Sequence, residues 1–191
     1  VWLERAEALL EVALERFGAI DGGFYDTADD AEALYLRPRD VSDNPTPSGT
    51  SALVAALRLV GLLADRHDLT ARAEEAAATL HGFAAAAPRF AGSALVDIVV
   101  SDEARTGLSR ATAVVVTPDG DPLAELARAT WRMAPVGTAV VVGRPGTTGF
   151  AHHFESRPAG EDGLVYVCRG TVCFAPAADL ADLRTALWSR A

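Results

Sequence analysis

The sequence predicts an α+β protein with a helical part up to about residue 105 and a small α/β part after it. Three observations support this fold class. Apolar residues recur at helical spacing in the first half of the chain. In the second half, two β-branched runs flank one helix, and a C-x4-C segment contains the turn between two short strands.

Residues 1–105 resemble a piece of a layered helical domain. Helices are expected up to residue 17 and over 51–64, 70–87 and about 90–100. The helix at 51–64 is apolar on nearly every side, which is typical of a helix surrounded by protein. The helix at 70–87 is amphipathic. A buried helix beside a half-exposed one is what an inner and an outer layer of helices would give.

The connection between the first two helices carries many polar and turn-forming residues. A Gly-Gly turn precedes residues 23–36, which are expected to form a β-hairpin. Two prolines stiffen the segment Asp43–Gly49, and Ser48 or Thr50 can cap the helix that follows. This segment is interpreted either as a hydroxyl- or anion-binding loop or as a rigid connector.

The sequence predicts a small β-sheet in residues 106–191. Strands at 113–116 and 138–142 flank a helix that Asp121 would cap, which is the order of a parallel βαβ unit. A hairpin over 164–168 and 172–174 would turn at Arg169-Gly170. Asp179 is expected to cap a last helix that ends at Trp188.

Composition excludes several classes of function. All 17 basic residues are arginine, so lysine chemistry such as a P-loop or a Schiff base is absent. A net charge of -9 argues against binding to nucleic acid or to an anionic membrane. The two cysteines do not form a secreted disulfide framework, and a cytoplasmic protein without a cofactor is expected.

Two clusters of side chains are candidates for chemistry. Asp26, Asp29, Asp30 and Glu32 could hold a cation or supply an acid/base group, or they could form a solvated turn. Cys168 and Cys173 could be a redox pair, two of four metal ligands with His152 and His153 nearby, or two small buried apolar residues. Arg169 would stabilise a nearby thiolate. Cα atoms more than about 7 Å apart would exclude a disulfide, and no metal site is predicted.

Four stretches together resemble one family, the thioredoxin-domain proteins related to spermatogenesis-associated protein 20. They are Gly22–Asp30, Arg37-Pro38, Asp43–Gly49, and Tyr166–Gly170 with Cys173 and Pro176. The resemblance is to the C-terminal part of such proteins and covers nearly the whole chain. It implies the terminal helices of an (α/α)6 toroid, similar to N-acylglucosamine 2-epimerases and six-hairpin glycosidases, followed by an α/β appendage.

The resemblance also implies partners and a site. The first residues already read as helix interior, so the chain is expected to be part of a longer one. Its partners would then be the thioredoxin-like domain and the remaining toroid helices. By analogy with toroids, a sugar-like ligand would meet residues at the pocket rim: Phe24, Tyr25, Asp26, Arg37, Asp43, Asn44 and Ser48.

Three functional hypotheses follow. The chain contributes to a carbohydrate pocket of epimerase- or glycosidase-like character, it is a redox accessory that uses Cys168 and Cys173, or it is a structural segment that closes the toroid and mediates domain or homodimer contacts. The distance between the two sulfurs separates the second hypothesis from the others, because cysteines too far apart to be bridged would exclude it. Engagement of the rim side chains in local caps and turns would favour the third.

Overall fold

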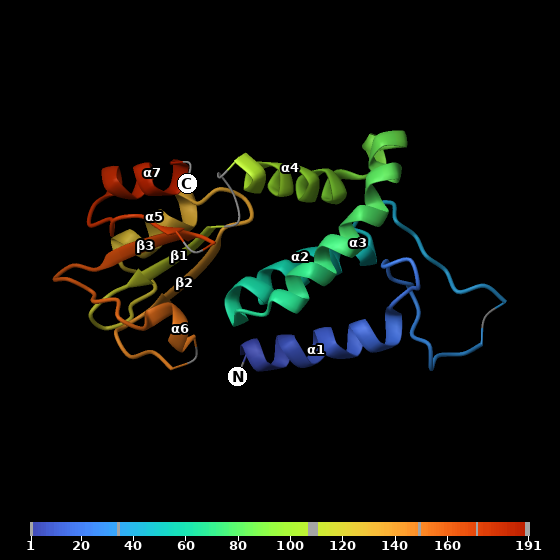
Figure 1. The fold of residues 1–191 in the computed structure, drawn as a ribbon, viewed down its shortest axis with the longest axis horizontal. Coiled ribbons are helices and arrows are strands. Elements are labelled where there is room, and N and C mark those ends of the chain that lie inside the picture. Colours follow the sequence, from blue (N-terminus) through green and yellow to red (C-terminus); the bar gives the residue numbers. More distant parts are fainter. Residues whose placement is uncertain (1, 34, 107–110, 149, 171, 190–191) are drawn as a thin grey trace. The chain divides into compact units, whose positions relative to one another are not determined.

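The computed structural model describes residues 2–33, 35–106, 111–148, 150–170 and 172–189 (Figure 1). The chain divides into two units, Val1–Val99 and Val100–Ala191. The boundary lies a few residues before the division predicted at 105/106, within one helix. Helices and strands coexist as the α+β class requires, and each unit is described below by itself.

The first unit is helical and its core forms where three helices meet. Its elements are α1 (Trp2–Phe17), α2 (Gly49–Ala64), α3 (His67–Ala86), a 3-10 turn (Pro88–Phe90) and α4 (Gly92–Thr106), which continues into the second unit. Leu10 of α1, Leu57 of α2 and Ala73 of α3 are buried in one apolar cluster. The opposite side of α2 leaves Leu59 about half exposed, so the expected burial of this helix on every side is not observed.

The β-hairpin predicted at residues 23–36 is wrong for the residues that the structure describes, and Leu34 lies outside them. Phe24 forms a single bridge with Gly18 instead. The Tyr25 N–H donates to the carbonyl of Phe17, and the Asp26 N–H donates to that of Pro38. These backbone groups are satisfied at the end of α1 and by the returning chain, so no ladder with residues 35–36 forms.

The second unit contains a four-stranded mixed sheet in the order β2-β1-β3-β4. Its elements are β1 (Ala111–Val116), α5 (Glu125–Met133), β2 (Ala139–Gly143), α6 (Ala151–Phe154), β3 (Leu164–Arg169), β4 (Val172–Cys173) and α7 (Leu180–Trp188). β1 and β2 are parallel, as the predicted βαβ unit requires. β3 is antiparallel to both β1 and β4, so the predicted second hairpin is also confirmed.

Two details at helix starts test the predicted caps. The Asp179 carboxylate accepts hydrogen bonds from the N–H groups of Ala181 and Asp182, which confirms the cap of α7. Asp121 instead forms a turn with the N–H of Leu123, and α5 begins only at Glu125. The prediction that Asp121 caps this helix was therefore wrong.

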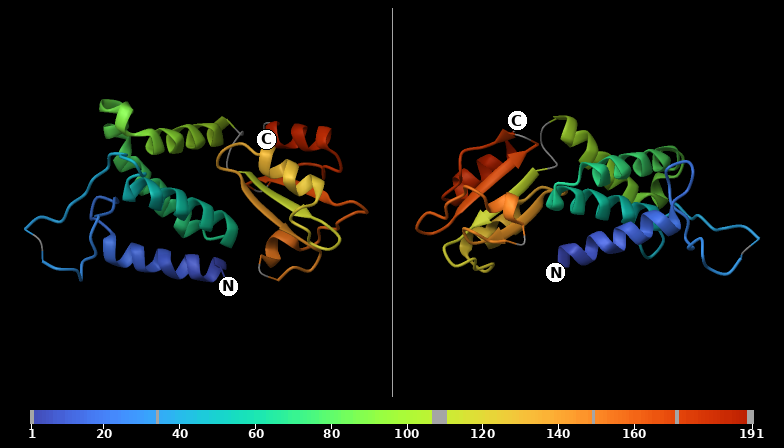
Figure 2. Two further views of the ribbon diagram at one scale, coloured as in Figure 1. Left: turned by 180° about the vertical axis from the view of Figure 1, so that it is seen from behind. Right: turned by 60° about the horizontal axis from the view of Figure 1, so that its bottom comes forward.

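The two faces of the sheet are covered differently. Val115, Val165 and Val167 point to one face and pack in a core with Leu126 of α5 and Leu183 of α7. Their neighbours along the strands point to the other face, because side chains alternate along a strand. The short α6 packs against β1, and Figures 1 and 2 show α6 on the side of the sheet opposite α5 and α7.

Candidate functional site

Three of the predicted rim residues, Tyr25, Asp26 and Arg37, lie in the connection after α1. The Arg37 guanidinium lies 4.1 Å from the centre of the Tyr25 ring. It also donates to the carbonyls of Arg16 at 3.1 Å and Thr27 at 2.5 Å. The Asp26 carboxylate accepts the N–H of Asp40 at 2.8 Å. These contacts hold the loop against the C-terminal end of α1, so the three side chains stabilise the conformation of the loop.

Asp43 and Ser48 connect the loop to two helix starts. The Ser48 hydroxyl accepts the Ser51 N–H and caps α2, which confirms the predicted cap. The Asp43 carboxylate accepts the N–H of Ser48 at 3.0 Å and of Ser93, near the start of α4, at 2.5 Å. Partial burial acts to raise the pKa of Asp43, but the hydrogen bonds from Ser93 and Ser48 outweigh it and the pKa lies below its ordinary value.

The other two predicted rim residues differ in exposure. Phe24 is only 1% exposed and belongs to the core of the first unit, with the Arg72 guanidinium 4.6 Å from its ring centre. Asn44 is exposed, and its N–H donates to the carbonyl of Thr46. Phe24 is therefore placed to hold the fold, whereas Asn44 keeps its side chain at the surface.

The two cysteines form a disulfide. Cys168 on β3 and Cys173 on β4 are direct partners in the hairpin register, with Cα atoms 3.9 Å apart. This lies well within the limit of about 7 Å beyond which a bridge is excluded. Cys168 is 8% exposed, whereas Cys173 is exposed on the edge strand. The interpretation as two small buried apolar residues was therefore wrong, and the two sulfurs differ in access to solvent.

Arg157 is aimed at both sulfurs. One terminal nitrogen of its guanidinium lies 3.6 Å from Sγ of Cys168 and 3.8 Å from Sγ of Cys173. The other donates to the backbone carbonyls of His152 and His153 in α6. The guanidinium is thus held by α6 on one side and presents its remaining donors to the disulfide. A cation in this position stabilises a thiolate on either sulfur.

Arg169 does not take the role expected from its place in the sequence. It follows Cys168 directly, so its side chain leaves the opposite face of the sheet. There it is 6% exposed and donates to the carbonyls of Leu187 at 2.6 Å and Ser189 at 3.2 Å, at the C-terminal end of α7. Burial lowers the pKa of Arg169 from its ordinary value. The cation beside the sulfurs is Arg157, in a loop where no local sequence motif marks it.

The two histidines lie in the short helix α6. His152 and His153 are the two central residues of the four-residue α6, with ring centres 3.9 Å apart. Within the described part of the chain, no group of three or more His, Cys, Asp or Glu side chains is placed to hold a metal ion. The acidic turn contains an ion pair instead, because Arg16 lies 3.4 Å from carboxylate oxygens of both Asp29 and Asp30.

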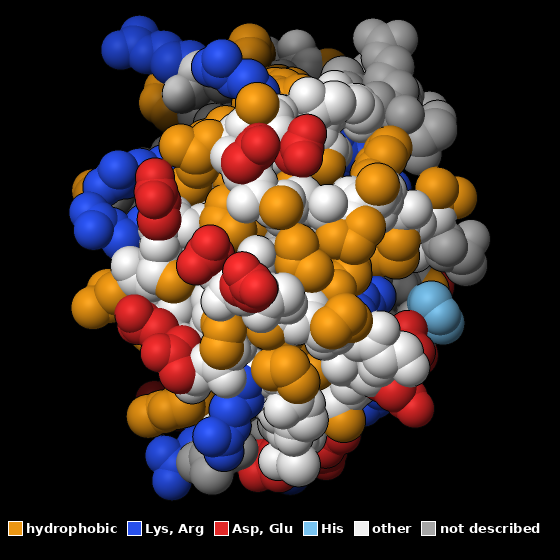
Figure 3. All heavy atoms as spheres, turned by 90° about the vertical axis from the view of Figure 1, so that its left-hand side faces the viewer, with side chains coloured by type: hydrophobic (Ala, Val, Ile, Leu, Met, Phe, Trp, Pro, Cys, Tyr) orange, Lys and Arg blue, Asp and Glu red, His pale blue; other side chains and the backbone are white. Residues whose placement is uncertain are grey.

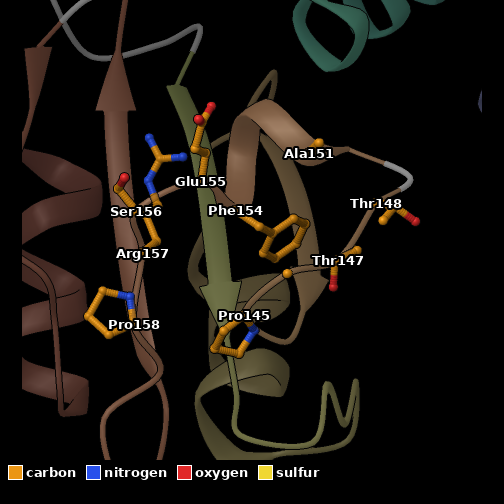
Figure 4. A pocket seen from close by; sticks show the side chains of 10 residues that line it. Pro145, Thr147, Thr148, Ala151, Phe154, Glu155, Ser156, Arg157 and Pro158 are labelled. Carbon is orange, nitrogen blue, oxygen red and sulfur yellow. The ribbon is translucent and has the colours of Figure 1, made fainter.

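A cavity of about 670 Å³ opens beside the segment that carries Arg157. Figure 4 shows its walls: the loop after β2 on one side, and α6 with the residues that follow it on the other. The lining includes Pro145, Thr148, Phe154, Ser156, Arg157 and Pro158. Arg157 therefore belongs both to the wall of the cavity and to the surroundings of the disulfide.

Comparison of the chain with models of protein families, with curated proteins and with solved structures gives no significant match. The resemblance described above therefore stays a prediction. Among the described residues, no helix combines the length and the apolar character that a membrane span requires. The surroundings of the disulfide are accordingly the main basis for a functional proposal.

Proposed function

We propose that Cys168 and Cys173 exchange their disulfide with the dithiol of a protein partner. The observation that carries this proposal is Arg157, whose guanidinium lies within hydrogen-bonding distance of both sulfurs. A structural disulfide needs no such cation, because neither sulfur is charged while the bond is intact. A thiolate formed by exchange does gain from it.

The difference in exposure gives the exchange a direction. A partner thiolate attacks Sγ of Cys173, which is exposed, and the bond to Cys168 breaks. The electron pair goes to Sγ of Cys168, whose negative charge then lies beside Arg157. The partner's second thiolate attacks its own sulfur in the mixed disulfide and releases Cys173 as a thiolate. The partner loses two electrons and this chain gains them.

Location and partner are part of the proposal. In a cytoplasmic protein, which the composition predicts, a disulfide is usually catalytic or redox-sensing. The resemblance implies a thioredoxin-like domain in the longer chain, and its dithiol is the partner that we propose. The redox role is preferred to the sugar pocket because Arg37, Asp43 and Ser48 are engaged with backbone groups of their own loop and the adjacent helices.

Two single-cysteine variants of the full chain test this function. We expect reduced Cys168→Ser to form a mixed disulfide with oxidised glutathione readily through the exposed Cys173. Cys173→Ser should react at least about tenfold more slowly, because access controls exchange at the buried Cys168. Mass spectrometry would follow both reactions. The proposal is refuted if dithiothreitol reduces the wild-type disulfide only after the chain unfolds, because the bond would then be structural.

A further inference from the structure

The cavity and the disulfide belong to the same side of the sheet. Tyr166 and Cys168 alternate with the core residues Val165 and Val167, so they face α6 and not α7. The Tyr166 hydroxyl donates to the carbonyl of Pro158 at 2.8 Å, and this bond fixes the cavity wall to β3. The Arg157 guanidinium lies 5.7 Å from the Tyr166 ring centre. Arg157 therefore spans from the cavity wall to the sulfurs.

The lining of the cavity suits a polypeptide segment. Pro145, Phe154 and Pro158 offer apolar surface, and the hydroxyls of Thr148 and Ser156 can bond to peptide groups. A volume of about 670 Å³ is that of an ordinary small-ligand site and accommodates a few residues. Figure 3 shows one end of this unit, where apolar side chains lie among both acidic and basic ones.

We infer that this cavity binds the segment of polypeptide that flanks the attacking cysteine of a protein thiol partner. The inference rests on the proposed exchange at Cys173. The lining carries one acidic side chain, Glu155, and one basic one, Arg157. Arg157 supports this occupant, because the partner's thiolate is an anion and the Arg157 guanidinium is the lining group that also contacts both sulfurs. Binding the flanking residues holds the thiolate near Sγ of Cys173, which raises the rate of attack.

The chemical step is the same thiol–disulfide exchange at Sγ of Cys173. The bond between the partner's sulfur and Sγ of Cys173 forms while the bond to Cys168 breaks, and the electron pair leaves on Cys168. The cavity only positions the partner's thiolate near Sγ of Cys173 and takes no part in making or breaking bonds. A small thiol without flanking residues would react at the same sulfur but would gain nothing from the cavity, and this difference separates the two kinds of reductant.

The test compares two thiol probes on the oxidised full chain. One is N-acetylcysteine amide, and the other is a nine-residue peptide with a central cysteine between alanine, leucine and threonine residues. We expect the peptide to form the mixed disulfide about tenfold faster, after correction for the fraction of thiolate in each probe, which corresponds to about 1.4 kcal/mol. Rate constants would be measured by quenched-flow alkylation and mass spectrometry.

Two tryptophan variants localise the effect. Thr148 is exposed and lines the cavity, so Thr148→Trp should fill it and bring the ratio of the two rates close to one. Its rate with N-acetylcysteine amide should not change. Glu161 is exposed and is not among the lining residues, so Glu161→Trp should keep the wild-type ratio. Equal rates of both probes on the wild type, or an unchanged ratio in Thr148→Trp, would overturn the inference. Failure of both probes to react would overturn the proposed exchange itself.

Discussion

Replacing Arg157 by methionine should make the Cys168–Cys173 couple harder to reduce. The guanidinium lies 3.6 and 3.8 Å from the two sulfurs and stabilises the thiolate of the reduced form. Two unit charges about 4 Å apart attract by about 1 kcal/mol in water and about 4 kcal/mol at an effective dielectric constant of 20. The Arg157 side chain is only half-buried, so solvent screens the attraction and a value of about 1 to 2 kcal/mol applies. The reduction potential should therefore fall by about 20 to 40 mV, since 30 mV corresponds to about 1.4 kcal/mol for two electrons.

The assay equilibrates the full chain in glutathione redox buffers near neutral pH and quantifies free thiols by alkylation. Arg157→Lys keeps the charge without the planar fork and should recover much of the loss. Arg184→Met removes an exposed arginine of α7 and serves as the matched control. An unchanged potential in Arg157→Met, or an equal shift in Arg184→Met, would refute the electrostatic argument.

Two further predictions concern the helical unit. Leu57 is fully buried, whereas Leu59 on the same helix is 49% exposed. Leu57→Ala should therefore lower the free energy of unfolding by about 2 to 5 kcal/mol, and Leu59→Ala should lower it by less than about 1 kcal/mol. Urea titration of both variants would measure these losses. Similar losses in both variants would contradict the described core. The pKa of Asp43 in the folded chain lies below its ordinary value of 3.8, so its contribution is fully present above about pH 5 and is lost as the pH falls through that lowered pKa. Asp43→Asn should therefore cost about 1 to 3 kcal/mol at pH 7 and progressively less as the pH falls through the lowered pKa, and a loss that is independent of pH would exclude this role.

Elements with a local signal were predicted well. Ser48 precedes an apolar helix and caps it, and the two β-branched runs around α5 pair in parallel. In both cases short-range chemistry decides the outcome, through a free N–H at a helix start or through burial on both faces of a strand. The hairpin expected at 23–36 had only a turn signal and aromatic residues. Its backbone donors find carbonyls at Phe17 and Pro38, which no local pattern indicates.

The candidate site was predicted only in part. The C-x4-C spacing and the turn at Arg169-Gly170 allowed the cysteines to face each other, and the register of β3 and β4 does bring them together. Strand alternation alone would have excluded Arg169 as the nearby cation, because adjacent residues of a strand leave opposite faces. Arg157 could not be found in this way. Its position depends on α6 and on the contact between Tyr166 and Pro158, both of which arise from tertiary packing.

The disulfide closes a short ring and therefore contributes only modestly to the stability of the second unit. Its two cysteines are separated by 5 positions, so the bond removes little conformational entropy from the unfolded chain, about 2 kcal/mol by the loop-closure relation. A domain of this size typically has about 5 to 15 kcal/mol of stability. The sheet and α7 therefore do not depend on the bridge. The scaffold should therefore stay folded when the bridge is reduced, which is a condition that the proposed exchange requires.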